Sequence, residues 1–153
     1  MKTKFAFVLL AISFLASCRP TEDSVTVVGR FDDSTLIFRQ RIDTFIDADM
    51  QVALITLTRG NLACALTLFP QALARPEPAV PYKLVGSGEL SCSYGPILNV
   101  EWHQTSDHSG FGYSTNENDP GFMFGFSKYP FFALNQLDEA EKALFAYRNR
   151  EIQ

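Results

Sequence analysis

Alternation of apolar and polar residues constrains the fold of this chain more than any other feature of its sequence. Residues 97–105 show it best, with apolar positions set against polar ones: Leu98, Val100 and Trp102 against Asn99, Glu101 and His103. A repeat of two residues is that of a β-strand with one buried face. The sequence predicts further strands over residues 23–31, 35–42, 50–59, 62–69 and 89–94. An antiparallel sheet is therefore expected, with a hairpin turn at Arg59-Gly60-Asn61.

Two later segments combine glycine with aromatic residues. Residues 110–113 and 121–128 place aromatic side chains on one strand face and glycines on the other. Such strands suit the core of a sharply curved barrel, and their rings could equally line a ligand cavity. Both readings stay open. The candidate ligand or partner surface comprises Trp102, Phe111, Tyr113, Tyr129, Phe131 and Phe132, with residues 129–132 as its more exposed part.

The chain is predicted to close with one helix, over about residues 135–149. Asn135 suits its N-cap, and Arg148 and Arg150 suit its negative end. Leu137, Ala140, Leu144 and Phe145 form an apolar stripe at helical spacing. The predicted fold class is mainly β (α+β): an antiparallel sheet or small β-barrel or sandwich, with one C-terminal helix packed on it.

The N-terminus has the three zones of an export signal. Lys2 and Lys4 precede an apolar run over residues 5–14, which is shorter than the roughly 20 residues that span a bilayer. Small residues then precede a cysteine, as at a secretory cleavage site. Leu15-Ala16-Ser17-Cys18 resembles the bacterial lipobox at all four positions. The resemblance implies that Cys18 becomes lipidated, that cleavage occurs before it, and that the new amine is acylated.

This resemblance divides the chain into three parts. Residues 1–17 are a lipoprotein signal peptide, residues 18–23 a lipidated tether, and residues 24–153 a single β-rich periplasmic domain. The tether is short, since six extended residues reach about 20 Å. Arg19 stands where an aspartate commonly favours retention in the inner membrane of Gram-negative bacteria. The resemblance therefore implies an outer-membrane lipoprotein that faces the periplasm.

Two cysteines remain once Cys18 is lipidated. Cys64 and Cys92 each end a Gly-x-Leu-small-Cys pattern, in which leucine and cysteine share a strand face. Export places them in an oxidising compartment, where paired cysteines form disulfides. We therefore expect a Cys64–Cys92 disulfide.

The charge balance narrows the class of partner. Removal of the signal lowers Lys plus Arg from 13 to 11, against 17 Asp plus Glu, for a mature net charge of about −6. Nucleic acid is not expected as a partner, because binding phosphates needs a basic face. The expected partners are the membrane, through the lipid, and an envelope protein. The negative charge of the mature chain would attract a basic envelope protein.

The residues that carry chemistry form no catalytic or metal-binding pattern. His103 and His108 lie near Asp107 and Glu101, yet their spacing matches no zinc signature. The sequence contains no Gly-x-Ser-x-Gly nucleophile motif, and a disulfide-bonded Cys92 cannot act as a nucleophile. The sequence predicts no enzyme activity, no cofactor and no metal.

A short central stretch resembles the membrane-bound lysozyme inhibitors, which are small lipid-anchored β-barrels. The matching residues are Cys92-Ser93-Tyr94-Gly95, Leu98-x-Val100 and Ser109-Gly110-Phe111-Gly112-Tyr113-Ser114. Gly112 stands where that family usually has arginine, and the predicted helix and first strands lie outside its pattern. We expect a non-enzymatic binding module of the envelope. The alternatives are an inhibitor or immunity-type protein against a cell-wall hydrolase, and a carrier of a small apolar ligand.

Overall fold

The computed structural model describes residues 24–42, 53–71, 84–106, 108–116 and 120–150. Their elements are eight strands and one helix: β1 (Val25–Phe31), β2 (Phe38–Ile42), β3 (Ala53–Arg59), β4 (Leu62–Gln71), β5 (Leu84–Cys92), β6 (Leu98–Ser106), β7 (Ser109–Ser114), β8 (Phe122–Ser127) and α2 (Pro130–Arg150). Residues 1–23, which hold the predicted signal peptide and tether, lie outside the described part, as do residues 50–52 at the start of the strand predicted over 50–59.

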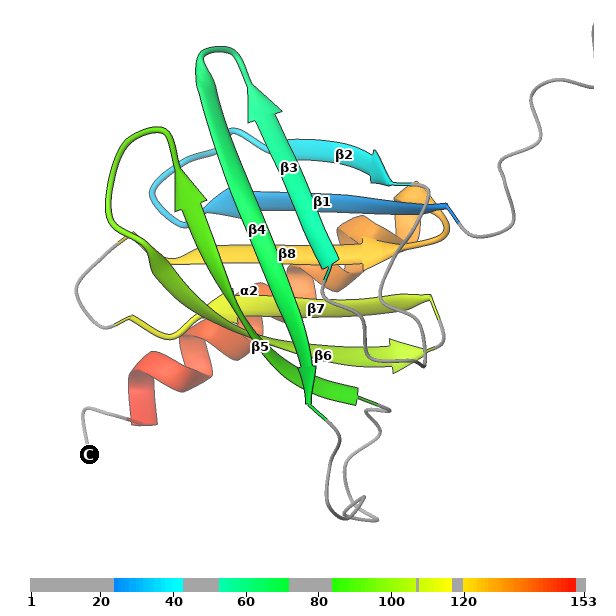
Figure 1. Cartoon of the computed structure of the whole chain (residues 1–153). Coiled ribbons are helices and arrows are strands. Elements are labelled where there is room, and N and C mark those ends of the chain that lie inside the picture. The colour runs from blue at the N-terminus through cyan, green and yellow to red at the C-terminus, as the bar shows by residue number, and fades with distance from the viewer. Residues whose placement is uncertain (1–23, 43–52, 72–83, 107, 117–119, 151–153) are drawn as a thin grey trace, which may run out of the picture.

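All eight strands belong to one antiparallel sheet, in the order β2-β1-β8-β7-β6-β5-β4-β3. Strands β3 to β8 follow one another as a meander, and β8 then pairs with β1, with Thr26 opposite Ser127. The sheet therefore curls into a nearly closed barrel, with β2 and β3 as its two edges (Figure 1). The predicted fold class is confirmed.

The up-and-down order gives the barrel two distinct ends. The connections 32–37, 60–61 and 93–97 lie at one end, together with residues 115–116 and 120–121 between β7 and β8; we call this end the mouth. At the other end β1 begins, beside the point where β8 leads into α2; we call this end the base. Because every hairpin reverses direction, the N-terminal side of β1 lies a full strand length from the mouth (Figure 1).

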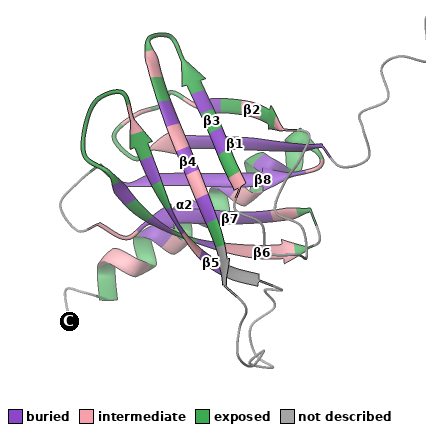
Figure 2. Ribbon diagram, in the orientation of Figure 1, coloured by how far each residue is buried: buried purple, intermediate pink, exposed green. Residues whose placement is uncertain are grey.

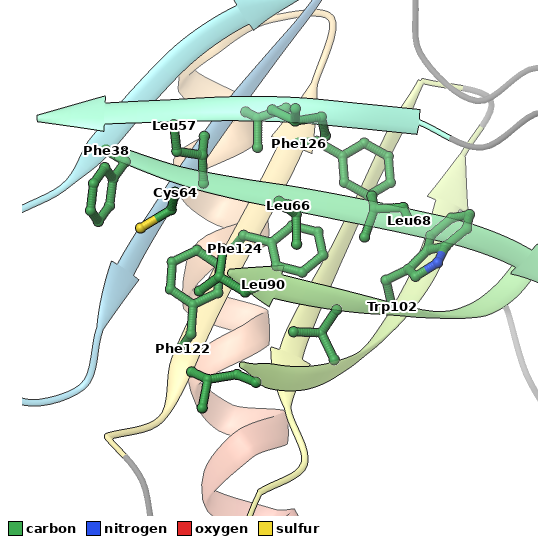
Figure 3. Packing of buried hydrophobic residues seen from close by; sticks show 14 of the residues in the cluster. Phe38, Leu57, Cys64, Leu66, Leu68, Leu90, Trp102, Phe122, Phe124 and Phe126 are labelled. Atoms are coloured by element: carbon green, nitrogen blue, oxygen red, sulfur yellow. The ribbon is translucent and has the colours of Figure 1, made fainter. Parts of the chain in front are cut away.

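The barrel interior is filled by side chains. Cys64, Leu66 and Leu68 of β4 point inward, as the alternation predicts, towards the phenylalanines of β8 (Figure 3). The largest fully buried side chains include Trp102, Phe122, Phe124 and Phe126. Eight-stranded barrels are just wide enough for side chains to fill them. The phenylalanines of the glycine-aromatic strand β8 are therefore core residues.

A second apolar cluster lies outside the barrel, where α2 covers β8, β7 and β1. Ala133, Leu137, Ala140 and Leu144 form the buried face of the helix, and they pack against Val28, Phe111, Tyr113 and Met123. Figure 2 shows that α2 has both buried and exposed stretches along its length. Gly125 lets the helix approach closely, since a Cβ there would lie 2.4 Å from the carbonyl oxygen of Ala133.

The helix differs from its prediction at its start and on one face. It begins at Pro130 rather than at Asn135, because proline fits the first turn of a helix, where its missing N–H is not needed. Phe145 was predicted in the buried stripe but is 71% exposed. Leu144 and Phe145 lie about 100° apart around the helix, so only one of them faces the sheet.

The hairpin and disulfide predictions hold. Gly60 and Asn61 connect β3 to β4, and the φ of Gly60 is +58°, in the region that favours glycine. Cys64 and Cys92 face each other on β4 and β5 and form a disulfide. The strand predicted from Thr35 begins only at Phe38, and Leu36 is exposed in the mouth.

Candidate functional site

The mouth of the barrel contains an apolar cavity of about 190 Å³ that opens to solvent. Its walls come from three of the mouth connections and from the strand ends beside all four: Phe31, Asp33, Leu62, Leu90, Cys92, Tyr94, Gly95, Pro96, Leu98 and Pro120. Asp33 is the one charged residue among them. An engineered cavity of about 150 Å³ accepts a benzene molecule, so this one accepts a group of about that size.

Large apolar side chains also stand on the rim. Tyr94 is 79% exposed and Ile97 is 58% exposed, on either side of Gly95-Pro96. Leu36 is exposed on the neighbouring connection between β1 and β2. Exposed apolar side chains around an apolar hollow are typical of a binding site rather than of ordinary surface.

The mouth is held in shape by bonds between its connections. The backbone N–H of Asp32 donates to the carbonyl of Gly121 at 2.8 Å, and the N–H of Ser93 donates to that of Ala63 at 2.8 Å. The side-chain oxygen of Asn116 accepts the N–H of Asn99 at 2.6 Å. A rim fixed in this way loses little conformational entropy when it binds.

Two arginines complete this bonding around the mouth. The guanidinium of Arg59 donates to the carbonyl of Ile37 and so links β3 to the connection that precedes β2. Arg148, at the end of α2, forms a salt bridge of 2.5 Å with Asp32. The open edge of the barrel and the helix are thereby tied to the same rim.

The predicted surface residues divide between core and surface. The side chains of Trp102, Phe111 and Tyr113 are buried, Trp102 inside the barrel and the other two beneath α2. They belong to the core because the barrel closes over one face of the sheet and the helix covers the other. Tyr129, Phe131 and Phe132 are exposed, as expected for the outer part of this set.

The outer face of β6 contains the polar residues that the sequence singled out. The hydroxyl of Tyr113 donates to the Glu101 carboxylate at 3.4 Å, and the His103 ring stacks on that of Tyr113. Burial and the nearby Glu101 raise the pKa of Tyr113 to about 12. Burial lowers the pKa of His103, and the Glu101 charge opposes that shift. Both effects favour neutral rings.

Metal ligands do not gather in the described residues, where no three His, Cys, Asp or Glu side chains form a group that could hold an ion. Asp107 lies outside them. Among the described residues, no helix is both long enough and apolar enough to cross a bilayer.

Sequence reasoning missed the mouth. The alternation places Leu62, Tyr94 and Ile97 only at the ends of the predicted strands 62–69, 89–94 and 97–105. A usable signal was present, because bulky apolar residues next to Gly95-Pro96 are unusual for an exposed turn. Only the up-and-down strand order brings this turn beside the other three.

Compared with protein-family models, with curated proteins and with solved structures, the chain shows no match.

Proposed function

We propose that this chain is a lipid-anchored bacterial envelope protein that acts as a non-enzymatic binding module, with the mouth as its binding site. The apolar cavity with its exposed rim is the observation that carries the proposal. The anchor rests on the lipobox at residues 15–18. Two or more acyl chains hold a protein on a membrane where one does not.

The mouth favours a protein partner over a free small ligand. Pockets that enclose small ligands usually have volumes of about 300–1,000 Å³, and this cavity is smaller. It fits one large side chain, as an interface anchor does. Asp33 in the wall and the mature charge of about −6 favour a basic residue beside that anchor.

Site-specific photo-crosslinking in living cells tests this assignment. A photoreactive residue replaces Ile97 on the rim, and a matched one replaces Leu54, which is 69% exposed on β3 near its base end. We expect a discrete crosslinked protein from position 97 and none from position 54. Identical products at both positions would contradict a binding site at the mouth.

A cavity-filling variant tests the same site independently. Leu62→Trp places a ring in the cavity, and Leu54→Trp adds the same bulk on the outer surface. The first change should lower crosslinking at position 97 by more than tenfold, and the second should leave it unchanged. Circular dichroism of both variants reports whether the barrel is intact.

Two further measurements separate the alternative functions. Turbidity assays with lysozymes show whether the partner is a cell-wall hydrolase of this kind. A crosslink to a lipid would indicate a carrier of a small apolar ligand instead.

A further inference from the structure

A second exposed apolar surface lies at the base of the barrel, where β8 leads into α2. Its members are Tyr129, Phe131, Phe132 and Leu134, and we call it the base patch. The rings of Tyr129 and Phe132 lie 6.0 Å apart, as do those of Phe131 and Phe132. The three rings therefore form one cluster, and Phe131 is 70% exposed.

The chain enters the barrel at this same end. Thr26 of β1 pairs with Ser127 of β8, so the start of β1 and the start of the base patch are neighbours. Ser127 in turn accepts the backbone N–H of Tyr129 at 3.3 Å. The described chain begins at Ser24, six residues after Cys18. A lipid on Cys18 would then lie within about 20 Å of Ser24, at the same end of the barrel as the patch.

Charged side chains at the base also suit a lipid surface. Lys128 directly precedes the patch, and Arg41 lies at the end of β2, where its guanidinium donates to the Ser24 hydroxyl at 2.5 Å. Basic side chains near a membrane are attracted by anionic lipids. Tyrosine is enriched where hydrocarbon meets headgroups, because its ring is apolar and its hydroxyl polar.

We propose that the base patch lies in the headgroup region of the membrane and orients the barrel with its mouth away from the bilayer. The proposal rests on the proposed anchor, because a tether of six residues keeps the local concentration of the patch at the surface high. The occupant of the patch is the lipid surface itself. A strand of seven residues spans about 23 Å, so the mouth would face the periplasm at about that height.

Environment-sensitive fluorescence on the native lipidated protein in vesicles of phosphatidylethanolamine and phosphatidylglycerol tests this. Phe131→Cys and Phe145→Cys each provide a free thiol for the probe, since Cys64 and Cys92 are joined. Both positions are exposed on α2 and lie fourteen residues apart. We expect a blue shift and quenching by spin-labelled lipids at position 131 only. Equal signals at both positions, or none at 131, would overturn the proposal.

A second arm separates the patch from the anchor. A Cys18→Ser chain with an N-terminal histidine tag is held on vesicles that contain a nickel-chelating lipid, and the same two probes are compared. Mass spectrometry of the native product reports the acylation of Cys18 by itself. If Cys18 is unmodified and the probe at 131 is blue-shifted on the chelating vesicles, the proposed lipid anchor is refuted and the membrane contact of the base patch is supported. If Cys18 is acylated and the probe at 131 is not shifted, the membrane contact of the base patch is refuted and the lipid anchor is supported.

Discussion

At the scale of single residues, the barrel interior combines glycines with large aromatic rings. A Cβ on Gly110 or Gly112 would lie 2.4 Å from the ring of Phe126 or Phe124, respectively. A Cβ on Gly86 would lie 2.3 Å from the indole nitrogen of Trp102. The alternation of small and large residues lets the rings fill a narrow barrel.

Gly125 is the position where added volume should act on the helix. Gly125→Ala places a methyl group against the backbone of Ala133 and Leu137, so we expect a loss of about 1–3 kcal/mol in the free energy of unfolding. Urea denaturation measures it. Gly60→Asn is the control, since its surroundings are open and asparagine tolerates positive φ. Equal stability of Gly125→Ala and wild type would show that the helix adjusts freely.

Tyr113 should make stability depend on alkaline pH. Its pKa of about 12 in the folded chain exceeds the ordinary value of about 10. The folded state therefore holds this proton more tightly, so its contribution is complete below about pH 10 and is lost as the pH rises towards 12. Tyr113→Phe should lack that part of the decline in unfolding free energy. A phenolate absorbance change of this residue with a midpoint near pH 10 would refute the assignment.

At the scale of elements, α2 covers the outer face of the sheet through one side of the helix. The helix packs through one stripe, in which Leu137 is buried, and leaves Phe145 in solvent. Leu137→Ala should cost about 2–5 kcal/mol of unfolding free energy, because it opens a cavity under the helix. Phe145→Ala, on the solvent-exposed side of the helix, should change it by less than about 0.5 kcal/mol. Thermal unfolding of the two variants makes the comparison, and similar costs would contradict the assigned face.

The disulfide joins β4 to β5 at the mouth. It closes a loop with a sequence separation of 28 residues, so its removal in a Cys64→Ser/Cys92→Ser double variant should cost about 3.5 kcal/mol of unfolding free energy. Cys92 also lines the cavity. Crosslinking from position 97 should therefore decrease in that variant under conditions where circular dichroism shows it to be folded. An unchanged free energy of unfolding in the double variant would show that strand pairing, and not the disulfide, stabilises the contact between β4 and β5.

At the scale of the whole molecule, the described residues form two apolar surfaces at opposite ends of the barrel. The base patch lies where the chain enters, and the mouth lies where the hairpins turn. Cys18→Ser should shift the protein from the membrane fraction to the soluble fraction without changing its unfolding midpoint, because residue 18 precedes the barrel. Ultracentrifugation of cell extracts and denaturation of the purified chain check both parts. Membrane association that survives the substitution would argue against lipid attachment at Cys18.

The sequence by itself determined the features that depend on near neighbours. Alternation in residues 97–105 assigned Trp102 to the inner face, Gly60-Asn61 marked a turn, and two matching patterns paired Cys64 with Cys92. Tertiary structure decided which exposed segments meet. Tyr94 joins Phe31 and Leu62 at one cavity only because the barrel closes. Phe111 became buried only because α2 lies over it, and such long-range contacts leave no periodic trace in the sequence.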